Sequence, residues 1–266
     1  MVFRLLTIAL LLTAAPVLGG ESRQLCLSCH PAHYVERGRC SDCHRGNPAS
    51  ERKNIAHASL RAGKYARFTV GDEAFLKEGE RLMDRLACRR CHVSAGRGNR
   101  LAVSLDGAAA RKTAGELVLS IRRPVAAMPN FGLDEEQITT LVNAVLAGSQ
   151  GREMDAAAPV RVHFNISGKK NPDIFSTKCG GCHRMLSQSL GAVGTGEAGP
   201  DLSGLFSKQY PKTFRDGEAW NARNLGVWLK NPREIRRWAR MQPVVLTGAE
   251  AKELESIILV SPEVSK

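Results

Sequence analysis

The feature that most constrains this chain is a short pattern that occurs four times: two cysteines three positions apart, followed at once by histidine. The copies span residues 26–30, 40–44, 88–92 and 179–183. Together they use all eight cysteines of the 266-residue chain. Histidine is rare here, at 7 residues, yet it follows every pair. One repeated chemistry therefore accounts for every thiol.

Cys-x-x-Cys-His is the attachment pattern of c-type haem. Two thiols add covalently to the porphyrin vinyl groups, and the histidine becomes the proximal ligand of the iron. We therefore predict four covalently bound haem c groups. The thioethers would come from Cys26, Cys29, Cys40, Cys43, Cys88, Cys91, Cys179 and Cys182, and the proximal ligands would be His30, His44, His92 and His183. Two zinc sites of four thiolates each, or vicinal disulfides, are the alternative interpretations.

Each iron also needs a distal ligand unless its site is open to substrate. His33, His57 and His163 remain after the proximal ligands are assigned. His33 follows His30 by only three residues, so it cannot reach across the same porphyrin. We expect His33 to serve the second haem and His57 the first, although either could be an exposed loop residue. Nine residues separate His30 from Cys40, a span of at most roughly 35 Å, so these two haems should lie close together.

Methionines are the expected distal ligands of the other two haems. Met128 and Met241 stand on loops ahead of helical patterns, where we predict that they bind the third and fourth irons. For the fourth iron His163 is the rival ligand, and a packed loop methionine is the alternative role of either sulfur. Met83 lies on the apolar stripe of a helical pattern and is expected in the core. Met185, two residues after the fourth motif, lies on the proximal side.

The N-terminal residues 1–20 predict a signal peptide. One basic residue, Arg4, precedes an apolar run over residues 5–18, and cleavage is expected after Gly19 or Gly20. The run is too short for a comfortable membrane span, although an uncleaved anchor is the alternative. Covalent haem attachment takes place outside the cytoplasm. We therefore expect a periplasmic protein, whose association with a membrane complex stays open.

The motifs divide the remaining chain into three haem-bearing segments. We call residues 21–68 the first segment, 69–151 the second and 163–266 the third, with a linker at 152–162. Strand-like alternation is scarce throughout, so the expected fold class is mainly α. The first segment lacks a long periodic run and should consist of loop and short helix around two haems.

Helical signals are clearest in the second segment. Apolar residues recur at helical spacing over 75–86 and lead directly into the third motif. A closing helix is predicted after Asp134, with Gln137 completing a capping box and Gly148 ending the helix. In the third segment, Thr247 begins a similar capping box with the glutamate three residues later.

At these residues the second and third segments resemble class I cytochrome c domains. In that family a helix leads into Cys-x-x-Cys-His, a distal methionine follows on a later loop, and a C-terminal helix crosses the first. The match covers Gly79, 88–92, 128–131 and the helix after Asp134 in the second segment, and Phe175, 179–183, 199–202, 228–232 and Met241 in the third.

The resemblance implies two such helical domains, and it implies that the carbonyl of Pro200 steadies the fourth proximal imidazole. The second segment has no proline at the matching place, so a carbonyl near residues 101–105 must take that role. Pro172 leaves the third segment little room for an entry helix. The first segment resembles, more loosely, the bis-His dihaem modules of multihaem cytochromes.

The net charge of +12 could indicate nucleic acid or an anionic membrane as partner. However, each haem brings two propionates against one ferric charge, so four oxidised haems subtract roughly 4 charges. Lysine and arginine are also scattered along the chain. We therefore expect no nucleic-acid binding, while a basic docking face for an acidic redox partner and a merely solvated surface both stay open.

Four distal candidates match four haems, and no acid, base or nucleophile constellation accompanies them. We predict a tetrahaem electron-transfer protein that is not itself an enzyme, takes no small-molecule substrate and works with redox partner proteins. A thioether ligand raises haem potential, so the first segment should be the low-potential entry and the His/Met haems the exit. This would suit a subunit of, or a shuttle beside, a membrane quinol-oxidising complex. A multihaem reductase or haem sensor with one five-coordinate iron is the alternative.

Overall fold

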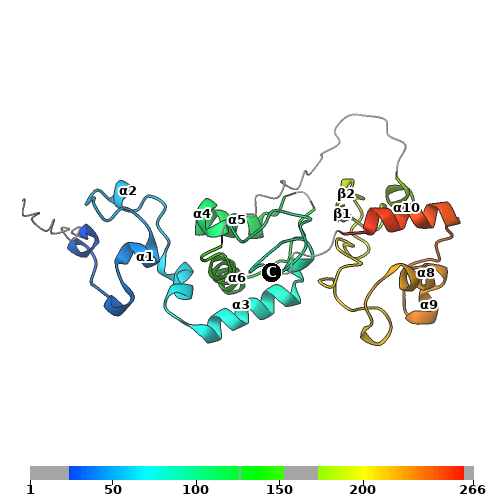
Figure 1. Cartoon of the computed structure of the whole chain (residues 1–266), viewed down its shortest axis with the longest axis horizontal. Coiled ribbons are helices and arrows are strands. Elements are labelled where there is room, and N and C mark those ends of the chain that lie inside the picture. Colours follow the sequence, from blue (N-terminus) through cyan, green and yellow to red (C-terminus); the bar gives the residue numbers. More distant parts are fainter. Residues whose placement is uncertain (1–23, 126, 153–172, 261–266) are drawn as a thin grey trace, which may run out of the picture.

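The computed structural model describes residues 24–125, 127–152 and 173–260. The expected signal peptide, most of the expected linker and His163 lie outside these ranges. The three segments follow one another along the long axis of the molecule (Figure 1). The described chain is mainly helical, and its strands β1 (Met185–Ser187) and β2 (Gly191–Val193) form one antiparallel hairpin. The mainly α expectation is confirmed.

The first segment consists of short helices joined by turns. They are η1 (Leu25–Ser28), η2 (Val35–Arg37), α1 (Cys40–His44), α2 (Lys53–Ala56), η3 (Gly63–Tyr65) and η4 (Arg67–Thr69). After α1 the chain turns back at Gly46, whose φ is +80°. A Cβ there would lie 2.5 Å from the carbonyl oxygen of Ala56, so the close return requires glycine. The amide of Asn47 donates to the same carbonyl at 2.9 Å.

The second segment is built on two long helices that cross. Its elements are α3 (Glu73–Arg85), η5 (Cys88–Arg90), α4 (Ala108–Arg111), α5 (Ala114–Arg122) and α6 (Glu135–Gly148). Figure 1 shows α6 nearly end-on, with α3 lying across it. At the contact a Cβ on Gly79 would lie 2.7 Å from the Cβ of Ala144, so glycine lets the helices approach closely. The predicted capping box of Asp134 and Gln137 is confirmed.

Helix α6 is buried on both of its lateral faces. One face packs with Tyr65 and Phe68, and the other packs with Leu82 and Met83 of α3. Met83 is 1% exposed, so its expected place in the core is confirmed.

The second segment also holds the end of the first. The buried Asn143 of α6 accepts from the amide of Phe68 at 3.2 Å and donates to the carbonyl of Lys64 at 2.8 Å. The expected boundary at residue 68 therefore lies inside a packed contact.

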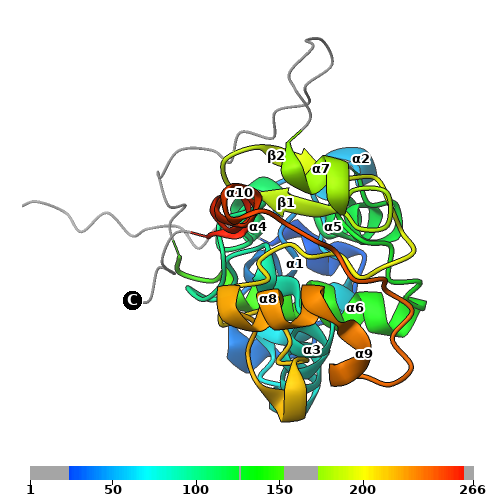
Figure 2. The same cartoon turned by 90° about the vertical axis from the view of Figure 1, so that its right-hand side faces the viewer.

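The third segment surrounds a separate apolar core. Its elements are α7 (Ile174–Lys178), β1, β2, η6 (Arg215–Gly217), α8 (Ala222–Lys230), α9 (Pro232–Ile235) and α10 (Gly248–Ile258). The entry helix α7 has only five residues, as the position of Pro172 predicts, and its Ile174 amide donates to Glu253 of α10 at 3.2 Å. The capping box at Thr247 is confirmed. Figure 2 shows α7, α8, α9 and α10 facing the viewer around the hairpin.

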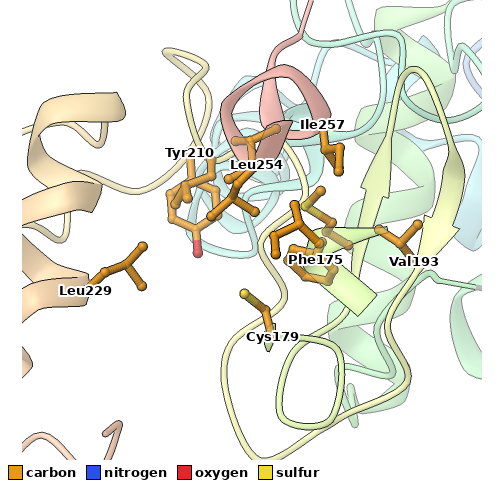
Figure 3. Close-up of a cluster of buried hydrophobic side chains, with 11 residues drawn as sticks. Phe175, Cys179, Val193, Tyr210, Leu229, Leu254 and Ile257 are labelled. Atoms are coloured by element: carbon orange, nitrogen blue, oxygen red, sulfur yellow. The ribbon is translucent and has the colours of Figure 1, made fainter. Parts of the chain in front are cut away.

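Phe175 is fully buried at the centre of the third core. Cys179 borders the same cluster as Phe175, Tyr210 and Leu254 (Figure 3). The attachment motif is therefore continuous with the hydrophobic core.

Among the described residues, no helix is long and apolar enough to cross a membrane. The apolar run at residues 5–18 is not part of that comparison because it lies outside them.

Candidate haem sites

The first segment brings its four histidines together in two crossed pairs. The ring centroids of His30 and His57 lie 6.0 Å apart, and those of His33 and His44 lie 5.5 Å apart. An imidazole nitrogen binds a first-row metal at about 2 Å, so two rings on opposite sides of one iron have centroids about 6 Å apart. The pairs therefore fit two bis-imidazole sites, in the crossed arrangement that the spacing of the chain predicts.

Backbone geometry delivers each partner histidine to its pair. His57 is the C-cap of α2, and its amide donates to the carbonyl of Lys53 at 2.9 Å. The amide of Leu25 donates to the carbonyl of Pro48 at 2.9 Å, which holds the loop before α2 against the first motif. On the other side, the ring of Tyr34 meets that of His33 edge-on, with centroids 5.3 Å apart.

Arg61 holds the second motif through three hydrogen bonds. Its carbonyl accepts from Nδ1 of His44 at 3.0 Å, its amide donates to the His44 carbonyl at 2.6 Å, and its guanidinium donates to the carbonyl of Cys43 at 3.0 Å. Burial, together with the nearby charge of Arg45, lowers the pKa of Arg61. Because Nδ1 of His44 is engaged by this carbonyl, Nε2 is the nitrogen that remains available to a metal.

A cavity of about 170 Å³ lies at this second site. Its lining combines the attachment pair and both imidazoles with residues just before the motif and residues around the boundary between the first and second segments. The lining residues are His33, Tyr34, Gly38, Arg39, Cys40, Cys43, His44, Gly63, Ala66, Arg67, Thr69 and Val70. The two thiols and two imidazoles around this cavity are the groups that a covalently bound haem with two axial imidazoles would require.

In the second segment His92 is fixed by one carbonyl. Its Nδ1 donates to the oxygen of Val103 at 2.7 Å, so the carbonyl expected near residues 101–105 is that of Val103. Burial lowers the pKa of His92 and so favours the neutral imidazole that a metal requires.

The residue after Cys88 clamps the third motif to α3. The Arg89 guanidinium is 4% exposed and lies 2.6 Å from a Glu80 carboxylate oxygen and 2.7 Å from one of Asp84. It also donates to the carbonyl of Ser94 at 3.3 Å. The rigid core of α3 and α6 thus sets the position of the motif.

In the third segment His183 is held in the same way. Its Nδ1 donates to the carbonyl of Pro200 at 2.8 Å, which confirms the role that the family resemblance implies for this proline. A Cβ on Gly199 would lie 2.2 Å from the imidazole. Only glycine therefore allows the loop to pass so close to the ring.

The two predicted distal methionines lie in different surroundings. Met128 is half-buried on the loop before α6, next to the buried Ala127. The sulfur of Met241 accepts a hydrogen bond from Nε1 of Trp228 at 3.1 Å, and its side chain packs against the third core. Met185 lies in β1, 1% exposed in that core. Ligation by Met128 or Met241 stays a prediction, and the rival His163 is outside the described residues.

The alternative interpretations of the cysteines find no support in this geometry. All eight cysteines lie in the described ranges and are free of disulfides. Within those ranges, no three cysteine, histidine or acidic side chains gather as a metal site of the zinc type. Burial raises the pKa of Cys88 and of Cys91 to about 11, so as free thiols both would stay protonated at neutral pH.

Some supporting residues escape sequence reasoning. Thr113 and Glu116 form a reciprocal capping box at the start of α5, and the Thr-x-x-Glu spacing could have revealed it. Arg61 and Asn143 have no comparable signal, because each acts through backbone groups that the fold brings together.

Comparison with known proteins agrees with this geometry in the second segment. A family model described as cytochrome C oxidase, cbb3-type, subunit III matches residues 74–143, which run from α3 through the third motif into α6. No curated protein and no solved structure matches the chain. The match supports a c-type cytochrome domain in this part of the chain, with covalently bound haem c, haem-based electron transfer and redox proteins as partners.

Proposed function

We propose that the chain is a tetrahaem c-type cytochrome that carries electrons along a fixed series of sites. Each Cys-x-x-Cys-His motif holds one haem c through its two thioethers. His30, His44, His92 and His183 are the proximal ligands. Three observations support equivalent roles for the motifs: Nδ1 of His44, His92 and His183 each meets a backbone carbonyl, at 3.0, 2.7 and 2.8 Å.

The distal ligands in this proposal are His57 for the first site, His33 for the second, Met128 for the third and Met241 for the fourth. The crossed histidine pairs support the first two assignments. The loop positions ahead of α6 and α10 support the two methionines.

The observation that carries electron transfer, rather than catalysis, is the presence of a second imidazole at both first-segment sites. A paired imidazole leaves no coordination position for a substrate. When bound, haem c supplies reversible one-electron exchange at iron. The chain's own residues then have three tasks: the carbonyls orient the imidazoles, the cores of the second and third segments exclude water, and the crossed loops keep two sites close together.

The proposed location is the periplasm, to which the signal peptide would direct the chain before cleavage after Gly19 or Gly20. A quinol-level membrane donor would reduce the bis-His first segment, and a higher-potential redox protein would accept electrons from the His/Met sites, because a thioether raises potential relative to imidazole. The donor would be a membrane quinol-oxidising complex in which the chain is a subunit, or beside which it is a shuttle.

The test combines mass and ligand binding on the full-length holoprotein. The mass of the denatured chain should include four haems, since thioethers survive denaturation. The reduced protein should also show no rapid, stoichiometric binding of carbon monoxide. Fewer than four covalent haems would overturn the tetrahaem assignment. Rapid binding at one haem would favour the reductase or sensor instead.

A further inference from the structure

The third motif does not stand alone, because Arg90 inside it contacts the loop that supports the fourth motif. One guanidinium nitrogen of Arg90 donates to the carbonyl of Asp201 at 2.8 Å, and another lies 3.7 Å from its carboxylate. The two side chains are 13% and 8% exposed. The Arg90 guanidinium also lies 5.8 Å from the ring centroid of Tyr210, whose hydroxyl donates to the same Asp201 carbonyl at 3.2 Å.

The backbone of Arg90 is tied to the third segment as well. The Asn99 amide donates to the carbonyl of Arg90 at 2.8 Å and to the hydroxyl of Ser207 at 2.7 Å. Gly204 lies against this pair with a φ of +70°. A Cβ there would come within 2.7 Å of the Arg90 carbonyl and 2.9 Å of the Asn99 amide. Only glycine lets the two segments meet this closely.

Asp201 directly follows Pro200, whose carbonyl accepts from His183. A short run of covalent and hydrogen bonds therefore leads from Cys91 through Arg90 and Asp201 to the fourth proximal imidazole. The second carboxylate oxygen of Asp201 is buried without a hydrogen-bond partner among the described residues, 3.8 Å from Nε of Arg184. A buried carboxylate between two arginines is expensive to leave unpaired, so the contact is a strong constraint on both loops.

An apolar patch completes the contact beside these polar groups. Leu101 and Ala127 of the second segment pack with Leu186 of the third, at 2%, 8% and 8% exposure, and Cys91 borders the patch. The hydroxyl of Ser203, fully buried, accepts from the amide of Leu186 at 2.8 Å and so ties the patch to the loop that carries Asp201. The attachment residue itself therefore lies at the boundary between the segments.

We propose that this contact, which we call the Arg90–Asp201 junction, locks the third and fourth haem sites into one electron-transfer unit. The junction comprises Arg90, Asn99, Asp201, Gly204 and Ser207. The inference rests on the proposed function, because it requires a haem at both motifs. One electron leaves one site and enters the other, and no bond forms or breaks. Redox partner proteins supply and remove the electron. Segments joined only by a linker would move relative to each other. The junction instead keeps the distance between the third and fourth haem sites short and constant.

The test uses full-length holoprotein with single substitutions that disrupt the junction. Gly204→Ala pushes a methyl group toward the Arg90 carbonyl. Arg90→Gln removes the charge, and both cores should stay folded because Arg90 belongs to neither of them. The matched control is Gly217→Ala, because Gly217 also has a positive φ, at +84°, but a Cβ there meets nothing within 4 Å. Both junction variants keep all four attachment motifs.

Two readouts are compared: the rate of internal electron redistribution after pulsed one-electron reduction, and the radius of gyration from small-angle scattering. We expect both junction variants to lose the fast phase between the third and fourth sites and to show a larger radius, with unchanged ligand spectra. The control should behave like the parent protein. If both variants keep the fast phase and the radius, the junction proposal is overturned while the tetrahaem function stands. A parent protein lacking haem at either motif rejects the proposed function and the junction together.

Discussion

The first and second segments reach order by different physical routes. Between residues 24 and 60 no described residue is buried, whereas α6 alone buries eight. Apolar burial is the main favourable term in folding, so the second segment can hold its shape through α3 and α6. The first segment relies on turns, backbone hydrogen bonds and paired histidines. Its order should therefore depend on haem ligation, while that of the second should depend on packing.

The sharpest test of this difference removes the haems of the first segment. Replacing Cys26, Cys29, Cys40 and Cys43 together by alanine should abolish amide-exchange protection over residues 24–60, because little apolar surface remains to hold them. Helices α3 and α6 should stay protected. Hydrogen exchange on the full chain measures both regions at once. Retained protection over residues 24–60 would mean that this segment folds without its cofactors.

A core substitution tests the opposite dependence. Leu146 is 1% exposed in α6, and Leu27 is 49% exposed beside the first attachment pair. Leu146→Ala should destabilise the second segment by about 2–5 kcal/mol, while Leu27→Ala should change stability by less than about 0.5 kcal/mol. Denaturant unfolding followed through helix content compares the two. Equal effects would show that the first segment has a core that the structure does not reveal.

The proposed distal ligands should give the segments different spectra. Met128→Ala and Met241→Ala should each remove part of the sulfur-to-iron charge-transfer band of the oxidised protein, and neither change should alter the bis-His signals. His57→Met should instead raise the potential of one low-potential haem. If Met241→Ala leaves the band intact while His163→Ala changes the spectrum, histidine is the fourth distal ligand.

The smallest expected effect concerns the start of α5. Thr113→Ala removes an N-cap and should cost about 1 kcal/mol. Thr139→Ala, which removes only a hydroxyl bond to the Glu135 carbonyl inside α6, is the control and should be close to neutral. Thermal unfolding of the two variants measures the difference. Equal stabilities would exclude a role for the cap.

The same capping box should also respond to pH. Hydrogen bonds from the amide and then the hydroxyl of Thr113 hold the pKa of Glu116 below its ordinary value. The contribution of ionised Glu116 to the stability of the folded state is therefore complete above the ordinary carboxylate pKa. It is lost as pH falls through the lowered pKa of the folded state. Part of the difference between the parent protein and Thr113→Ala should disappear in acid.

Local patterns predicted the parts of the molecule that local forces determine. The capping boxes at Asp134 and Thr247 follow from residues three positions apart. The approach of the His33 ring to that of His44 agrees with the short spacing between His30 and His33, which keeps His33 from crossing the first porphyrin. The carbonyl of Pro200 was placed through a family resemblance. The end of the first segment was not predicted, because Tyr65 and Phe68 are buried by α6, about seventy residues further along the chain. The contact of Arg90 with Asp201 was not predicted either, because it joins loops separated by 111 positions.

The most direct test of the proposed four-haem chain is a potentiometric titration of the full-length holoprotein, with spectra that assign each step to its ligands. Full length is required because Tyr65 and Phe68 belong to the second core. We expect four one-electron steps. The two lowest should come from the bis-His haems of the first segment and should be spread apart, since reducing one places negative charge beside the other. The two highest should carry the His/Met signature. A His/Met haem with the lowest potential of the four would contradict the proposed order of electron flow, and fewer than four steps would contradict the tetrahaem chain itself.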